Sequence, residues 1–225
     1  MRNSPSSANA CQPLLQQCYD SALGARSLAS SIKSGEVGSL RIAVSATIET
    51  ALLMPYILEL RKLFKRLEVK LMRGTTTQVA EFMKTGSAEL AIASSLGDAW
   101  DRLDTWPLFS EGFVLVVGTS HRLAGRNSIQ LSDVRSEALL MRIYAEYFES
   151  LSSVLRSHGF PIDRAHEMPS EHDLEAFLQQ GFGVAFVPQS VLFSDCVKRV
   201  PVTGLDLYVA LHSAATRSSM AIRLR

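Results

Sequence analysis

The sequence predicts a mixed α/β fold arranged as two lobes. Strand and helix patterns alternate from Leu40 onward, this alternation changes after Phe113, and a late strand, LYVALH at 207–212, is available to return to the first sheet. A chain of 225 residues with 47% hydrophobic residues is long enough to build two small cores. We therefore expect each lobe to hold a mixed sheet flanked by helices.

The first lobe has the pattern of a βαβαβ unit. Its strand-like runs are LRIAVS (40–45), LEVKLM (67–72) and LAIAS (90–94). Apolar residues at helical spacing mark the first intervening helix: Leu53, Tyr56, Ile57, Leu60 and Phe64. The second helix lies within GTTTQVAEFMKTG, where the hydroxyls suit a helix start and Gly86 suits its end. Right-handed crossovers then place the residues after the first and third strands on one carboxyl edge, where such sheets bind ligands.

The second lobe is predicted from FVLVVG (113–118), ALLMR (138–142), a helix near 144–158 and the buried strand VAFVP (184–188). A further helix over 171–180 has Ser170 as a plausible N-cap. Two lobes joined by crossing strands leave a cleft between them, and such clefts are favoured sites for small molecules.

The N-terminal segment is expected to be separate from both lobes. Residues 1–11 are rich in Ser, Asn and Ala and are predicted to be disordered, whereas residues 12–36 form a helical pattern with a single apolar stripe. That stripe is covered either by a partner helix or by folding back on the following domain, and periodicity alone does not choose between them.

Composition excludes several functions. With 23 Lys and Arg against 22 Asp and Glu, the chain lacks the basic excess expected of a free-standing nucleic-acid binder. Neither a signal peptide nor a membrane-length apolar run is present, so we expect a cytoplasmic protein without membrane contact. Cys11, Cys18 and Cys196 show no metal-ligand spacing, and we expect no metal, no disulfide framework and no cofactor.

The first candidate binding residues are Ser45, Ala46 and Thr47, where the first strand stops. If a helix begins there, its N-terminal N–H groups and partial positive charge form a cradle for an anion, with a carboxylate as the expected guest. The alternative is that Ser45 or Thr47 simply caps the helix. Ser94 and Ser95 follow the neighbouring strand and can add donors, although serines are also common in turns.

The second lobe contributes a candidate cation. Arg142 ends a strand and is followed by Tyr144, a combination suited to gripping an acidic or aromatic ligand. The alternative is a surface arginine paired with Glu146 or Glu149. Ser170 is ambiguous between helix capping and lining of the cleft.

Catalysis is weakly indicated. The nearest approach to an acid–base or metal cluster is His166, His172 and Asp173, but Pro169 separates the two histidines and no HExxH or GxSxG frame exists. We therefore expect no catalytic residues and no enzyme activity. The enzyme alternative that we retain is a dehydratase-like protein descended from the solute-binding fold.

Four segments in this order resemble the effector-binding domain of LysR-type transcriptional regulators, whose fold is related to type-2 periplasmic solute-binding proteins. They are GSLRIAVSATIETALLMPYILELRKLF, LEVKLMRGTTTQVAEFMKTGSAELAIAS, FVLVVGTSHRLAG and FLQQGFGVAFVPQSV. The resemblance covers nearly the whole chain and implies a linker helix at 12–36, lobe I at 37–118 and 203–225, and lobe II at 119–202. It departs from the family pattern because neither a preceding helix-turn-helix nor the usual last helix is found.

The resemblance also implies a function. The domain would bind a small anionic metabolite, a carboxylate, between its lobes and so regulate transcription. It implies a homodimer, with a tetramer possible for the full-length form, and DNA contact only through a helix-turn-helix domain absent from this chain. The alternative with the same fold is a solute-binding protein for a transporter, for which a secretion signal would be expected.

Overall fold

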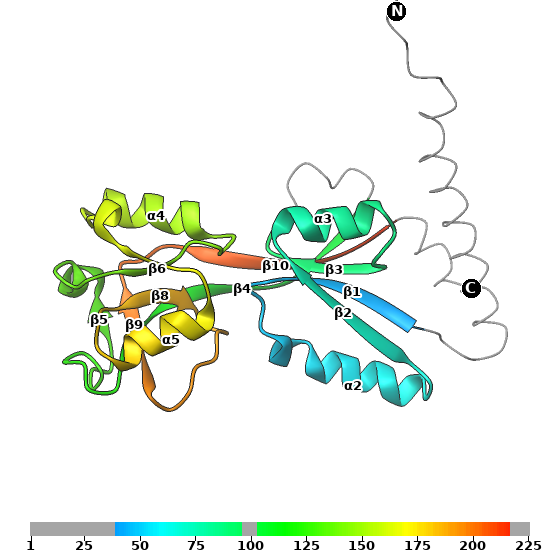
Figure 1. Ribbon diagram of the computed structural model, residues 1–225, viewed down its shortest axis with the longest axis horizontal. Helices are drawn as coiled ribbons and strands as arrows, with labels where there is room; N and C mark the ends of the chain where they lie inside the picture. The colour runs from blue at the N-terminus through cyan, green and yellow to red at the C-terminus, as the bar shows by residue number, and fades with distance from the viewer. Residues whose placement is uncertain (1–38, 96–102, 217–225) are drawn as a thin grey trace, which may run out of the picture.

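The computed structural model describes residues 39–95 and 103–216 and has two bodies joined by long strands (Figure 1). The predicted disordered segment at 1–11, the predicted helix at 12–36 and the last residues, 217–225, lie outside the described residues. Within the described ranges, no helix is long and apolar enough to cross a membrane.

Lobe I is built on three parallel strands in the order β2, β1, β3: Glu68–Gly74, Ser39–Ser45 and Leu90–Ala93. Helix α3 (Thr76–Lys84) covers one face and begins with a capping box between Thr75 and Gln78. Small strand residues, among them Ala43 and Ala91, let this helix pack closely through Val79 and Met83. The opposite face carries the short 3₁₀ turn η1 (Thr50–Leu52) and helix α2 (Met54–Leu63).

Two long antiparallel strands connect the lobes. Strand β4 (Leu103–Gly118) pairs in its first part with β10 (Tyr208–Thr216) and in its second part with strands of lobe II. The register of β4 and β10 shifts between Leu211 and His212, where Pro107 lies opposite His212. Because proline has no N–H to donate to a ladder, such an irregularity is a place where it is tolerated inside a sheet.

Lobe II packs around the second part of β4. Strands β8 (Ala185–Pro188) and β9 (Val197–Thr203) both pair with β4, and β5 (Ile129–Gln130) extends the sheet beside β9. A separate pair, β6 (Leu140–Arg142) and β7 (His166–Met168), lies between helices α4 (Phe148–Ser157) and α5 (Glu171–Gln179) (Figure 1). Short 3₁₀ turns, η3 (Leu131–Val134) and η4 (Ile162–Arg164), complete the lobe.

The predicted fold class is confirmed, with differences in individual elements. Strand β4 begins at Leu103 rather than Phe113, because its first part, LDTWPLFSEG, has no clear alternation and contains a proline. Helix α4 begins at Phe148, four residues after the predicted start. The sequence also failed to predict β5, β7 and β9, which are short or carry charged residues on exposed faces.

A close backbone approach before β8 yields a test of the lobe II packing. A Cβ atom at Gly183 would lie 2.2 Å from the carbonyl oxygen of Ala138, which accepts a hydrogen bond from the N–H of Val184 at 2.9 Å. We expect Gly183→Ala to lower the free energy of unfolding by about 1–3 kcal/mol, because the backbone must shift to relieve the overlap. In urea unfolding, the control Gly125→Ala, with nothing within 4 Å of its new Cβ, should match the wild type. Equal midpoints for the two variants would contradict this account.

Candidate functional site

The carboxyl edge of the lobe I sheet brings the predicted hydroxyls to one side of the molecule. Ser45 is the last residue of β1, and Ser94 and Ser95 directly follow β3, which runs parallel to it. Ser45 is buried, and its hydroxyl lies 3.2 Å from that of Thr47. The predicted common edge is therefore present in the described residues.

The predicted helix start at this edge is wrong. After Ser45 the chain makes a turn in which the N–H of Ala46 donates to the carbonyl of Gly74 at 2.8 Å, and the N–H of Ile48 donates to that of Ser45. Helix α2 begins only at Met54, because Pro55 suits the first turn of a helix. Residues 45–47 are therefore not at a helix N-terminus, which would supply the free N–H groups and the positive charge of the predicted anion cradle. The capping alternative is wrong as well, because the N-caps of η1 and α2 are Glu49 and Leu53 rather than Ser45 or Thr47.

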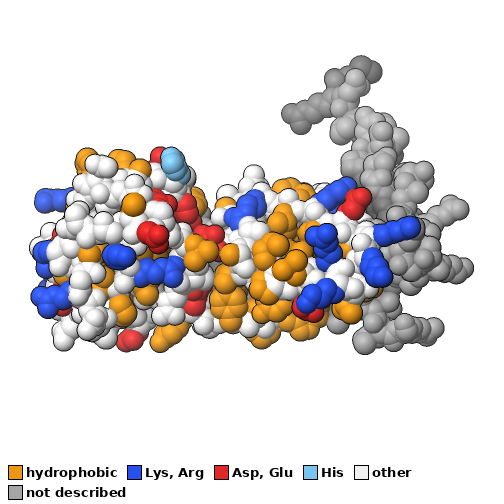
Figure 2. Space-filling view, turned by 90° about the horizontal axis from the view of Figure 1, so that it is seen from below, with side chains coloured by type: hydrophobic (Ala, Val, Ile, Leu, Met, Phe, Trp, Pro, Cys, Tyr) orange, Lys and Arg blue, Asp and Glu red, His pale blue; other side chains and the backbone are white. Residues whose placement is uncertain are grey.

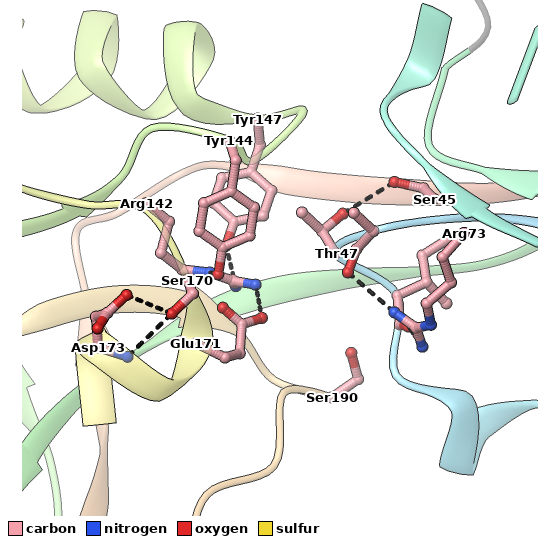
Figure 3. Close-up of polar contacts among 12 residues, drawn as sticks. Ser45, Thr47, Arg73, Arg142, Tyr144, Tyr147, Ser170, Glu171, Asp173 and Ser190 are labelled. Carbon is pink, nitrogen blue, oxygen red and sulfur yellow. Dashed lines mark hydrogen bonds and ion pairs between the residues drawn. The ribbon is translucent and has the colours of Figure 1, made fainter. Parts of the chain in front are cut away.

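An arginine that the sequence did not single out holds this turn. Arg73, near the end of β2, donates to the carbonyls of Ala46 at 3.0 Å and Ile48 at 2.7 Å, and to the hydroxyl of Thr50 at 2.6 Å. These bonds satisfy the carbonyl groups of a segment that is not helical. The turn that carries Thr47 is thereby held in place on the side of lobe I that faces lobe II (Figure 3).

Arg142 occupies the corresponding position in lobe II, but it is neither free nor on the surface. It is only 3% exposed, its Nε donates to the hydroxyl of Tyr144 at 3.1 Å, and its other nitrogens donate to Tyr147 and to the carboxylate of Glu171. Its guanidinium lies 5.3 and 5.7 Å from the centres of the two tyrosine rings (Figure 3). Pairing with Glu146 or Glu149, the predicted alternative, does not occur, and the cation already has an internal counter-ion.

The acid that neutralises Arg142 is itself perturbed. Burial raises the pKa of Glu171, Arg142 opposes that rise, and Glu49 from lobe I adds to it. Its Oε2 atom has no hydrogen-bond partner in the described part of the chain. The preceding residue, Ser170, caps α5: its hydroxyl accepts from the N–H of Asp173 at 3.1 Å and donates to the Asp173 carboxylate at 2.5 Å. The capping interpretation of Ser170 is thus confirmed.

A second acid, Glu146, connects the two lobes. It lies between β6 and α4 in lobe II, yet it accepts hydrogen bonds from the hydroxyl of Thr76, at 3.0 Å, and from both the N–H and the hydroxyl of Ser94 in lobe I. A third acid, Glu111 of β4, is buried and accepts from the N–H and hydroxyl of Ser190, each at 2.6 Å. Sequence reasoning missed both contacts, since the partners are far apart along the chain.

A pocket of about 320 Å³, which includes space open to solvent, lies between the lobes. Of the predicted residues, Thr47 and Ser94 line it, whereas Ser45, Ala46, Ser95, Arg142, Tyr144 and Ser170 do not. The other lining residues are Ile48, Leu52, Glu111, Glu146, Tyr147, Pro188, Ser190, Val209 and Leu211. The lining is thus apolar with a few hydroxyls and two carboxylates, and no Lys or Arg from the described residues is part of it.

Comparison with known sequences identifies relatives of this chain. A family model described as the LysR substrate binding domain matches residues 33–224. The chain is 28% identical over 163 residues to the HTH-type transcriptional regulator CysL of Bacillus subtilis (strain 168), a match to 72% of this chain and 54% of CysL. It is 25% identical over 211 residues to the HTH-type transcriptional regulator SsuR of Burkholderia cenocepacia, covering 92% of this chain and 67% of SsuR. The chain spans about half to two thirds of the length of the curated relatives it matches.

Solved structures share the fold. The reduced form of OxyR aligns with a TM-score of 0.68 at 20% identity, covering 84% of this chain and 91% of that chain. The BenM effector binding domain with its effector benzoate aligns with a TM-score of 0.67 at 19% identity, covering 81% and 85%.

The buried Tyr147 predicts a change of stability with pH. Burial raises the pKa of Tyr147 to about 12 against the opposing effect of Arg142, whereas a phenol in the unfolded chain ionises near 10. The folded state therefore holds this proton more tightly, so stability falls as the pH rises from about 10 to about 12, by roughly 2–3 kcal/mol in all. Tyr147→Phe removes this dependence, and urea unfolding at pH 9 and pH 11 measures it. Equal losses in the two proteins would contradict the assignment.

Proposed function

The chain belongs to the LysR substrate binding domain family, and from that premise we propose that it senses a small anionic metabolite, a carboxylate, between its lobes. The observation that carries the proposal is the inter-lobe pocket, to which lobe I gives Thr47 and Ser94 and lobe II gives Glu146 and Tyr147. A ligand in contact with both lobes binds the closed arrangement better than an open one, and this differential affinity shifts the population. In support of a carboxylate, the structurally similar BenM domain has benzoate as its effector.

The contact residues proposed for the effector are those at the mouth and walls of the pocket. Thr47 and Ser94 line it, and Ser45 is bonded to Thr47 just behind. Ala46, Ser95, Arg142, Tyr144 and Ser170 lie outside the lining, and we assign them a supporting role at most. Among these, Arg142 and Tyr144 support the wall through Tyr147, which does line the pocket.

A binding function is favoured over catalysis because the curated relatives are named transcriptional regulators. The same names support a cytoplasmic location and transcription regulation rather than solute uptake. We propose that DNA is contacted by a helix-turn-helix outside this chain, to which lobe closure is transmitted.

A ligand screen tests the sensing function. Carboxylates and amino acids are scanned by thermal shift, and a true effector at 100 times its dissociation constant adds about 2.7 kcal/mol of stability. Replacing both Ser45 and Thr47 with Ala should lower the affinity for the effector measured by calorimetry, because each lost hydrogen bond costs about 1 kcal/mol. The control Ser153→Ala, on the exposed side of α4, should bind normally. An unchanged affinity in the double variant would remove the hydroxyls from the site.

The exposed side of lobe I supports the proposed homodimer. Helix α2 has no buried residue, and apolar side chains gather over it in the view from below (Figure 2). The most exposed are Tyr56, at 72%, and Leu63, at 74%, and Leu71 of β2 is also exposed. In a symmetric dimer one substitution alters both copies of the patch.

We expect a dimer that survives deletion of residues 1–34 but is weakened by Leu63→Glu. Association removes apolar surface from water, at about 25 cal/mol per Å², whereas two buried carboxylates oppose it. Light scattering at micromolar concentration measures the mass. Leu192→Glu, an equally drastic change at an exposed leucine of lobe II, serves as the control and should remain dimeric. A monomer after the deletion alone would assign pairing to the N-terminal segment instead.

A further inference from the structure

The contact between Glu146 and lobe I has the chemistry of a bound carboxylate ligand. Both of its oxygens are engaged: Oε1 accepts from the hydroxyl of Thr76 at 3.0 Å, and Oε2 accepts from the N–H of Ser94 at 3.0 Å and from the Ser94 hydroxyl. All of these donors belong to lobe I, whereas the carboxylate belongs to lobe II. The bonds therefore exist only while the two lobes are close together.

The donors form a cradle whose geometry is fixed by lobe I alone. Thr76 is the first residue of α3, held by the capping box of Thr75 and Gln78, and Ser94 is the first residue after β3. Hydrogen bonds from N–H and O–H groups to a carboxylate are charge-assisted and stronger than bonds between neutral groups. We call Thr76 and Ser94 the lobe I cradle.

The same carboxylate lines the pocket. Ser94 and Glu146 are both part of its wall, beside Thr47. The other acid of the wall, Glu111, is buried on β4 and held by Ser190, so it belongs to the strand that connects the lobes. Glu146 lies instead on the segment between β6 and α4. A carboxylate that enters this pocket reaches the cradle only when Glu146 leaves it.

We propose that Glu146 is an internal stand-in for the effector: its carboxylate occupies the lobe I cradle, ties the lobes together without ligand, and is displaced when a carboxylate ligand takes its place. This inference rests on the proposed sensing function and adds that the ligand competes with the carboxylate of Glu146 for the lobe I cradle. A tethered carboxylate competes at an effective concentration in the millimolar range or above. The apparent affinity for the effector is reduced accordingly, and Glu146 sets the concentration at which the sensor responds.

A chemical rescue experiment on the full chain tests the proposal with acetate as the probe. Glu146→Ala empties the cradle, and its thermal midpoint in sodium chloride should fall below that of the wild type. Sodium acetate at equal ionic strength should restore much of the loss, with a half-saturating concentration about tenfold lower than in the wild type, the equivalent of one charge-assisted hydrogen bond. Adding Ser94→Ala to Glu146→Ala should abolish the rescue.

Two further variants keep the test decisive. Glu149→Ala removes an exposed acid three residues away, at the start of α4, and should show no response to acetate beyond that of the wild type. Glu146→Gln keeps the shape of the side chain but not its charge. This variant replaces Glu146→Ala as the test of the contact if the alanine variant does not fold. It should increase amide hydrogen exchange at Ser94, whose N–H loses a charged acceptor. An identical acetate response in the wild type and the Glu146 variant would overturn the proposal, as would unchanged exchange in Glu146→Gln.

The outcomes also separate this proposal from the sensing function on which it rests. If the screen yields an effector whose affinity is the same in the wild type and in Glu146→Ala, the sensor stands and displacement of Glu146 is overturned. If no effector is found but acetate rescues the variant, the cradle is established as a carboxylate site and the sensing function loses its support.

Discussion

The continuous strand β4 is the constraint on which the rest of the structure depends. Its sixteen residues pair first with β10 in lobe I and then with β8 and β9 in lobe II, so one ladder fixes the register of both bodies. Hydrogen-bonded strands resist sliding, because a slip of one residue turns every side chain to the opposite face. Relative motion of the lobes is therefore left to bending and twisting where the partners of β4 change. The pocket lies at this place, since Glu111 of β4 and Val209 and Leu211 of β10 are part of its lining.

Charged side chains near the point where β4 passes from lobe I to lobe II are held in pairs. A buried charge is costly unless it is paired or hydrogen-bonded, and Arg142 is surrounded by Glu171 and two tyrosine hydroxyls. Glu111 and Glu146 likewise hold donors from distant segments. The site is thus a set of occupied interactions rather than a cavity with free charges. Of these pairs, that of Glu146 with Thr76 and Ser94 is the one that joins lobe II to lobe I, so it is the pair that depends on lobe closure.

Sequence periodicity predicted the parallel core of lobe I well, because β1 and β3 are mostly apolar runs and β2 alternates Val69 and Leu71 with charged residues, and helix and turn signals lie between them. Periodicity failed to predict segments that become strands only because they pair with a strand far away in the sequence. The first part of β4 contains Pro107 and exposed aromatic residues, and it is a strand because β10 pairs with it. The start of α2 was misplaced for a similar reason: Arg73, from another strand, satisfies the turn at Ala46 and Ile48 and lets the helix begin later.

The sequence by itself determined the α/β class and the edge of the sheet at which hydroxyls gather, and it offered capping as one of two roles for Ser170, since each of these follows from local patterns along the chain. Only the tertiary structure decided which partners the charged side chains of the site have. Glu146 meets Ser94 across 52 residues, Glu111 meets Ser190 across 79, and Arg142 meets Glu171 across 29. No periodicity records such pairs, because a charged side chain on an irregular segment has the same local pattern whatever partner it reaches. The partner is chosen when the strands that join the lobes bring the two segments together.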